Sequence, residues 1–135
     1  MTAGITSNQP RLIALDWGTT SARAYLLDAA GTVLDAAPPG RGILTVTERA
    51  TTAKDRGAAF EQEFERMCGR WLDEHPTAPV LASGMVGSNQ GWADVPYQRL
   101  PQNLSSLAAA LVEIPPAVGA CTSCQVCLRT ETCLR

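Results

Sequence analysis

The chain has 135 residues, a formal net charge of −2 at pH 7, 45% apolar residues and 18% charged residues. This length suits one domain, and the composition excludes a disordered or fibrous chain. The charge gives no bulk attraction to nucleic acid, and the longest aliphatic run, at 107–112, is too short to cross a bilayer. The N-terminus lacks the pattern of a secretion signal. We therefore expect a cytoplasmic protein that binds neither nucleic acid nor membrane.

The first half of the chain predicts an antiparallel β-meander. Residues 1–10 are polar and predict a flexible arm. An apolar run at 11–16 predicts a buried strand, and two further strands are predicted at 22–28 and 32–37. Strands this close in sequence must pair antiparallel, because a parallel pair needs a longer crossover.

The second half predicts helices and a crossover strand. Residues 54–75 form the clearest helix, with one apolar stripe surrounded by charged residues such as Glu63. The stripe consists of Phe60, Phe64, Met67 and Trp71, with Cys68 beside them as a small apolar packing group. A strand at 78–82 follows this crossover and can lie parallel to the first strand, and a short helix is predicted at 103–112. The fold class is therefore a mixed α/β sheet flanked by helices.

The turn after the first strand carries groups suited to phosphate. It consists of Asp16, Trp17, Gly18, Thr19, Thr20 and Ser21. Gly18 lets the backbone approach a ligand closely, and three hydroxyls lie beside exposed N–H groups. Such a turn can cradle phosphate oxygens while Asp16 holds Mg²⁺. The alternative is an ordinary hairpin turn whose Asp16 accepts local N–H groups. A Walker-type loop is excluded, because no Gly-Lys-Ser/Thr run is present.

A second candidate loop follows the strand at 78–82, where open α/β sheets place their ligands. Its candidate substrate-binding residues are Gly84, Met85, Ser88, Asn89, Gln90 and Trp92. The glycines clear space, the polar side chains suit hydroxyls and a carboxylate, and Trp92 would wall a pocket. The alternative is a flexible polar loop with Trp92 filling the core.

Together these segments resemble the 2-dehydro-3-deoxygalactonokinase family of the sugar kinase, actin and Hsp70 superfamily. The resemblance covers about residues 11–116 and rests on residues 13–27, 42–44, 81–92 and 96–97. The Asp-Trp-Gly-Thr-Thr run is shared across the superfamily. The run Gly-Met-Val-Gly-Ser-x-x-Gly-Trp is much more specific.

The resemblance implies ATP-dependent phosphorylation of 2-dehydro-3-deoxy-D-galactonate at its terminal hydroxyl, in galactonate breakdown. It implies a ribonuclease-H-like fold in two lobes, with residues 11–116 as the N-terminal lobe. Asp16 would position Mg²⁺, the turn from Gly18 to Ser21 would bind ATP phosphates, and the loop at 84–92 would face the sugar acid. The catalytic base stays unidentified, because nothing in the sequence aims Asp94. Arg23 is a weaker candidate for anion binding, and His75 is expected to be a solvent-facing helix end.

The family's chain is longer, and its second phosphate loop and adenosine-binding part have no counterpart here. We therefore expect a half-built ATP cleft and an exposed inter-lobe face that is open to self-association. The chain alone is expected to be a truncated kinase of doubtful activity. The alternative is a non-catalytic lobe that binds a nucleotide or a partner without turnover.

Four of the five cysteines crowd the C-terminal end: Cys121, Cys124, Cys127 and Cys133. Four thiolates can hold zinc or an iron–sulfur cluster, although the last spacing departs from the usual iron–sulfur run. Residues 117–135 are thus predicted to be an atypical Cys-rich tail. One interpretation is a small metal-binding module. The favoured one is an altered reading frame, because the cluster begins where the family resemblance stops.

Overall fold

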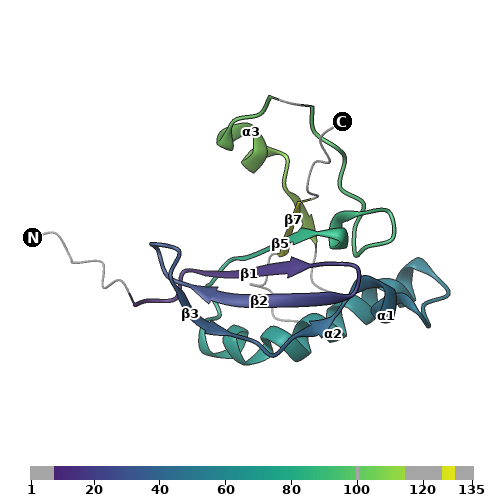
Figure 1. Ribbon diagram of the computed structural model, residues 1–135, viewed down its shortest axis with the longest axis horizontal. Helices are drawn as coiled ribbons and strands as arrows, with labels where there is room; N and C mark the ends of the chain where they lie inside the picture. Colours follow the sequence, from purple (N-terminus) through teal and green to yellow (C-terminus); the bar gives the residue numbers. More distant parts are fainter. Residues whose placement is uncertain (1–7, 100, 115–125, 130–135) are drawn as a thin grey trace, which may run out of the picture.

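A mixed sheet with helices on both sides makes up the protein (Figure 1), whose computed structural model describes residues 8–99, 101–114 and 126–129. β1 (Leu12–Trp17) lies between β2 (Ser21–Leu27) and β5 (Val80–Gly84). β1 pairs antiparallel with β2 and parallel with β5. The predicted mixed α/β sheet, with its meander and its parallel crossover, is confirmed.

The sheet extends to both sides of these strands in the order β3-β2-β1-β5-β7-β6. β3 (Val33–Ala36) and the short β4 (Gly40–Arg41) both pair antiparallel with β2. β7 (Val126–Arg129) runs parallel to β5, and β6 (Val112–Ile114) runs antiparallel to β7. Four residues of the predicted Cys-rich tail therefore extend the sheet.

Several short elements differ from the sequence prediction. α1 (Ile43–Thr47) was not expected, nor were β4, β6 and β7. The predicted helix at 103–112 is shorter, because α3 (Leu104–Ala109) ends before Val112 enters β6. Each of these elements has only two to six residues, which is too few for a periodic pattern to show. β7 also depends on a partner strand that is far away in sequence.

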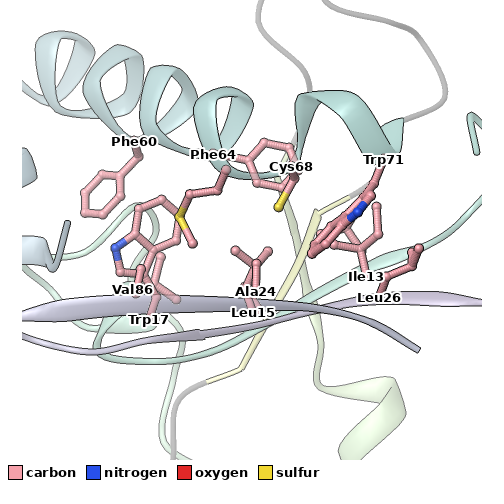
Figure 2. Close-up of a cluster of buried hydrophobic side chains, with 14 of the residues drawn as sticks. Ile13, Leu15, Trp17, Ala24, Leu26, Phe60, Phe64, Cys68, Trp71 and Val86 are labelled. Atoms are coloured by element: carbon pink, nitrogen blue, oxygen red, sulfur yellow. The ribbon is translucent and has the colours of Figure 1, made fainter. Parts of the chain in front are cut away.

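α2 (Ala53–Glu74) covers one face of the sheet. It begins with a capping box, in which the Thr52 hydroxyl accepts the Asp55 N–H and the Asp55 carboxylate accepts the Thr52 N–H. Its predicted apolar stripe is buried against every second residue of the central strands (Figure 2). These strand residues are Ile13, Leu15, Trp17, Ala22, Ala24, Leu26, Val80 and Ala82.

Cys68 lies within this core, as expected for a small apolar packing group. Its side chain is fully buried, and burial raises the pKa of its thiol to about 12. The thiol is therefore protonated at neutral pH and behaves as part of the stripe.

The opposite face of the sheet is less covered. Leu12, Tyr25, Leu27 and Leu81 are only partly buried on this face. α3 lies on this side (Figure 1), but none of its residues is buried. No helix among the residues that the structure describes is long and apolar enough to cross a membrane.

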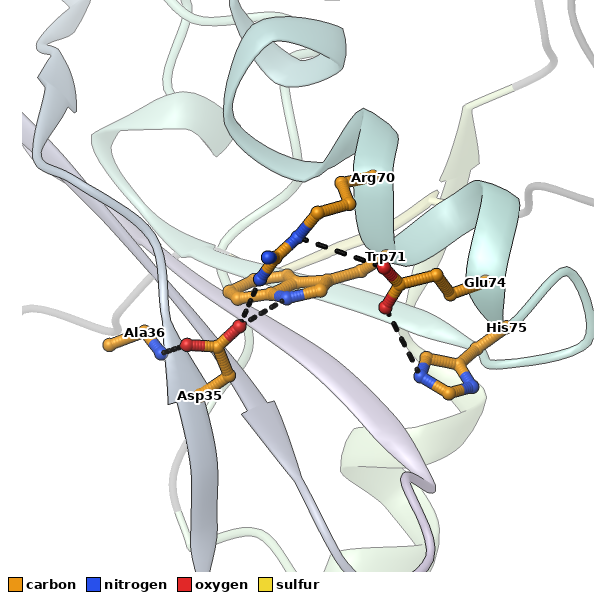
Figure 3. Close-up of polar contacts among 6 residues, drawn as sticks. All are labelled: Asp35, Ala36, Arg70, Trp71, Glu74 and His75. Atoms are coloured by element: carbon orange, nitrogen blue, oxygen red, sulfur yellow. Dashed lines mark hydrogen bonds and ion pairs between the residues drawn. The ribbon is translucent and has the colours of Figure 1, made fainter.

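A polar network fastens β3 to the C-terminal half of α2 (Figure 3). The Asp35 carboxylate accepts the indole N–H of Trp71 at 2.9 Å and pairs with the Arg70 guanidinium. Arg70 also lies 3.9 Å from Glu74, which in turn lies 3.9 Å from the C-cap residue His75. The Trp71 hydrogen bond, with Arg70, lowers the pKa of Asp35. The ionised carboxylate is thus part of the native structure.

Acid should weaken this attachment. The folded pKa of Asp35 lies below the unfolded value, so its contribution is complete above the unfolded pKa of about 3.9 and is lost as the pH falls through the folded pKa. We expect Asp35→Asn to lower the free energy of unfolding at pH 7 and to flatten its dependence on pH between about 5 and 3. Urea unfolding across this range measures both. Asp73→Asn, at an exposed acid of α2, is the control. If the free energy of unfolding depends equally on pH in both variants, the role assigned to Asp35 is wrong.

Candidate functional site

The two candidate loops leave neighbouring strands at one edge of the sheet. Parallel pairing sets Trp17 opposite Gly84 and Asp16 opposite Ser83. Both strands end at this point, so the turn at 18–21 and the loop that begins at Gly84 start side by side. The structure therefore brings together the two segments that sequence analysis selected.

Asp16 projects from the less covered face of the sheet. Strand alternation requires this, because Trp17 takes the buried side next to it. The Asp16 carboxylate is 56% exposed, and its Oδ2 lies 3.9 Å from Nη1 of Arg23, its register partner on β2. Such an exposed pair is weak. No described backbone N–H donates to Asp16, so the turn does not use it as a local acceptor.

Two backbone donors of the turn at 18–21 have no acceptor in the described part of the chain. The Gly18 N–H donates to the Ser21 carbonyl at 2.8 Å, which closes the turn. Thr19 and Thr20 are exposed, and their N–H groups find no acceptor within the described part of the chain. Two free N–H groups beside two hydroxyls form a small cradle for an anion.

The first residues of α1 hold this turn in place by hydrogen bonds. The N–H groups of Ile43 and Leu44 donate to the carbonyls of Gly18 and Thr19 at 3.0 and 3.2 Å. Gly42 lies so close that a Cβ there would be 2.3 Å from the Thr19 oxygen. Sequence analysis used residues 42–44 only as part of the resemblance and missed this support. The only sequence signal for this support was a glycine directly before two apolar residues.

Gly84 begins the second loop in a conformation that requires glycine. Its φ is +99°, and a Cβ would approach the Trp17 carbonyl oxygen to 2.8 Å. The chain then forms η1 (Met85–Gly87) and folds back, so that the Trp92 N–H donates to the Val86 carbonyl at 2.7 Å. A Cβ on Gly91 would lie 2.0 Å from that same carbonyl oxygen. The loop is thus a set of bonded turns that two glycines permit.

The polar residues of this loop have different surroundings. The Ser88 hydroxyl donates to the Met85 carbonyl at 2.7 Å and accepts the Gln90 N–H at 3.3 Å. Asn89 and Gln90 are exposed, and Met85 is 42% exposed. Met85, Asn89 and Gln90 are therefore the side chains that a ligand reaches first.

Trp92 packs into an aromatic cluster beneath the loop. Its ring stacks on Phe60 with 6.0 Å between centroids and lies 6.1 Å from Trp17 and 5.8 Å from Phe64. The alternative interpretation of Trp92, as a core residue, describes this packing. Trp17 lies at the end of β1 and Trp92 lies in the second loop, so the cluster also joins these two segments.

The remaining candidates differ in position. Asp94 is exposed directly after the second loop, and the N–H of the next residue, Val95, donates to the Gly87 carbonyl of that loop at 2.9 Å. His75 is the C-cap of α2. Among the described residues, no group of three or more His, Cys, Asp or Glu side chains is placed to hold a metal ion. Of the tail cysteines, Cys127 is described only by its backbone in β7, and Cys121, Cys124 and Cys133 lie outside the described residues. Both interpretations of the tail stay predictions.

The donors at the first turn fit the expected ligands. A carboxylate and hydroxyl oxygens are hard ligands of the kind Mg²⁺ prefers, and the free N–H groups suit phosphate oxygens. One carboxylate and one turn make up only one side of a nucleotide site. A hollow of about 960 Å³ lies elsewhere, between α1 and α2, and its lining includes Arg41, Glu63 and Arg66.

Comparison with known proteins gives consistent matches. A family model described as 2-keto-3-deoxy-galactonokinase matches residues 16–126, which ends inside the predicted tail. The 2-dehydro-3-deoxygalactonokinase of Escherichia coli strain K12 is 30% identical over 104 residues, covering 77% of this chain and 32% of the relative. A Rhizobium meliloti strain 1021 protein assigned the same activity is 30% identical over 109 residues, covering 76% of this chain and 30% of the relative.

A solved structure matches as well. It is a crystal structure of a Sinorhizobium meliloti protein assigned the same activity, with a TM-score of 0.60 and 22% identity, covering 90% of this chain and 34% of that one. At this identity the match shows the fold. The chain thus spans about a third of the length of the proteins that it matches.

Proposed function

The chain belongs to the 2-keto-3-deoxy-galactonokinase family, and on this basis we propose that it is the N-terminal lobe of a sugar-acid kinase. The proposed reaction transfers the terminal phosphoryl group of ATP to the terminal hydroxyl of 2-dehydro-3-deoxy-D-galactonate. The finer fold proposal is a ribonuclease-H-like lobe, which the antiparallel meander followed by parallel strands supports. Because the chain spans about a third of its relatives, the complete reaction needs a second lobe.

One observation carries the proposal: the exposed Asp16 carboxylate and the free N–H groups of Thr19 and Thr20 lie next to the loop at Gly84. Phosphoryl transfer depends on positioning and on neutralising charge, with little covalent chemistry from the protein. The turn would bind phosphate oxygens, and the second loop would orient the sugar acid. Mg²⁺, when bound by Asp16, would neutralise phosphate charge. A cytoplasmic location and self-association through the inter-lobe face also remain proposals.

The Asp16 carboxylate should account for the magnesium dependence of nucleotide binding. We expect the chain to bind ATP more tightly with Mg²⁺ than without it, and Asp16→Asn to weaken binding at least about tenfold in Mg²⁺ only, because the amide is a poorer cation ligand. Isothermal titration calorimetry with and without Mg²⁺ measures this. Asp73→Asn, at an exposed acid in the last turn of α2, should bind like the wild type. Equal affinities for Asp16→Asn and wild type would remove the proposed role.

The second candidate function is a lobe that binds nucleotide without turnover, because the Asp16 carboxylate and the Thr19 and Thr20 N–H groups suit a nucleotide while none of the described residues is identified as a catalytic base. An assay of ADP release with the sugar acid separates the two. Turnover supports a kinase, whereas magnesium-dependent binding without turnover supports a binding lobe.

A further inference from the structure

The peptide groups on either side of Arg41 are held by two buried side chains. Its N–H donates to Oε1 of Glu63 on α2 at 2.8 Å, and its carbonyl accepts the indole N–H of Trp17 at 2.9 Å. Glu63 is 5% exposed and Trp17 is fully buried. The chain is thus fixed to the helix and to β1 at the residue directly before Gly42.

Arg41 directly precedes the residues that contact the first turn. Gly42 touches the backbone of the turn, and the following N–H groups of Ile43 and Leu44 occupy two of its carbonyls. A shift of Arg41 would therefore move the groups that hold the turn.

Glu63 was expected among the charged residues around the helix stripe, and its burial corrects that prediction. A buried carboxylate is costly unless it is paired and hydrogen-bonded. Arg66 donates to both of its oxygens, at 2.7 and 3.1 Å, and this pairing lowers the pKa of Glu63. Arg66 itself is half exposed, so an ion pair alone does not require a buried acid. The Arg41 N–H gives the buried carboxylate a second partner, and an ionised acceptor strengthens that bond.

We propose that Glu63 is a positioning residue, which holds the turn at 18–21 through the main chain of Arg41 and Gly42 so that its N–H groups meet the phosphates. The identity of the ligand rests on the proposed function. The mechanical coupling between Glu63 and the turn does not, so the two are tested separately.

Three variants separate this role from the stability of the ion pair. Glu63→Met removes the acceptor at similar volume, Glu63→Gln keeps a neutral acceptor, and Arg66→Met removes the ion pair but keeps the contact with Arg41. Amide hydrogen exchange, followed residue by residue by NMR, reports the bonds of Ile43 and Leu44 to the turn. We expect these two amides to exchange at least about tenfold faster in Glu63→Met, less so in Glu63→Gln, and as in the wild type in Arg66→Met. The amide of Ala82 in β5 is the internal reference.

Binding of ATP with Mg²⁺ gives the second readout. Glu63→Met should weaken it, Glu63→Gln should partly restore it, and Arg66→Met should leave it unchanged. Equal exchange at Ile43 and Leu44 in Glu63→Met and Arg66→Met would overturn the coupling. Faster exchange with unchanged ATP affinity would overturn the positioning role. If the wild-type chain binds no ATP, the proposed function fails, while the exchange comparison still decides the coupling.

Glu63→Met is expected to fold, because methionine has a similar volume and because Arg41 and Glu63 both line the open hollow between α1 and α2. Should it not fold, Glu63→Gln and Arg66→Met carry the test. Faster exchange at Ile43 in Glu63→Gln than in Arg66→Met supports the proposal, and the reverse order overturns it.

Discussion

Phe60→Ala should lower the free energy of unfolding by about 3–5 kcal/mol. The Phe60 ring is fully buried, lies edge-on to Trp17 at 5.2 Å and stacks on Trp92. Neither neighbour can easily fill the cavity, because the indole N–H of Trp17 is bonded to Arg41 and the backbone of Trp92 is bonded to Val86. Urea denaturation followed by tryptophan fluorescence measures the loss. This loss is a large part of the free energy of unfolding of a typical domain, which is about 5–15 kcal/mol.

The matched control is Leu104→Ala on α3, where the side chain is 84% exposed. This change should stay within about 0.5 kcal/mol of the wild type. A loss below about 1 kcal/mol for Phe60→Ala would mean that the aromatic cluster is loosely packed and does not join β1 to the second loop.

Gly42→Ala should displace the first turn and destabilise the protein by about 1–3 kcal/mol. The added Cβ would lie 2.3 Å from the Thr19 oxygen and the Thr20 carbonyl carbon, and both are backbone atoms that cannot swing aside. The support from Ile43 and Leu44 would be lost with them. We therefore expect a lower free energy of unfolding in urea and, in calorimetry, weaker binding of ATP with Mg²⁺.

Gly57→Ala makes the same chemical change where space is available. No atom lies within 4 Å of a Cβ at this position, which is inside α2. Alanine is the better helix former, so this variant should gain about 0.5–1 kcal/mol. Opposite signs for the two glycines would confirm the close contact at Gly42, and a neutral Gly42→Ala would refute it.

The sequence predicted the centre of the fold because the pattern there is regular. The stripe on α2 and the alternation in β1 and β2 each extend over enough residues for the period to show. The parallel alignment of β5 with β1 followed from the long helix between them. That alignment was also enough to bring the two candidate loops together, since strand ends that pair in parallel share one edge.

The rest depends on contacts that no local pattern reveals. β7 forms by pairing with β5, and Trp92 packs against the core because its ring stacks on Phe60. Glu63 has the appearance of a surface charge in the sequence, yet its carboxylate is buried and accepts the N–H of Arg41 in β4, 22 residues earlier in the chain. The support that Gly42 gives to the turn likewise needs both chain segments in place.

The adjacency of Asp16 and Trp17 on β1 has a consequence for the fidelity of folding. Consecutive strand residues face opposite sides, so a slip of β1 by one position would exchange them. The slipped chain would bury a carboxylate and expose an indole, and an unpaired buried charge costs several kcal/mol. Molecules with a misplaced Asp16 carboxylate are therefore also molecules with a damaged core. Selection for a stable chain then removes the misassembled sites as well, without any separate check on the ligand itself.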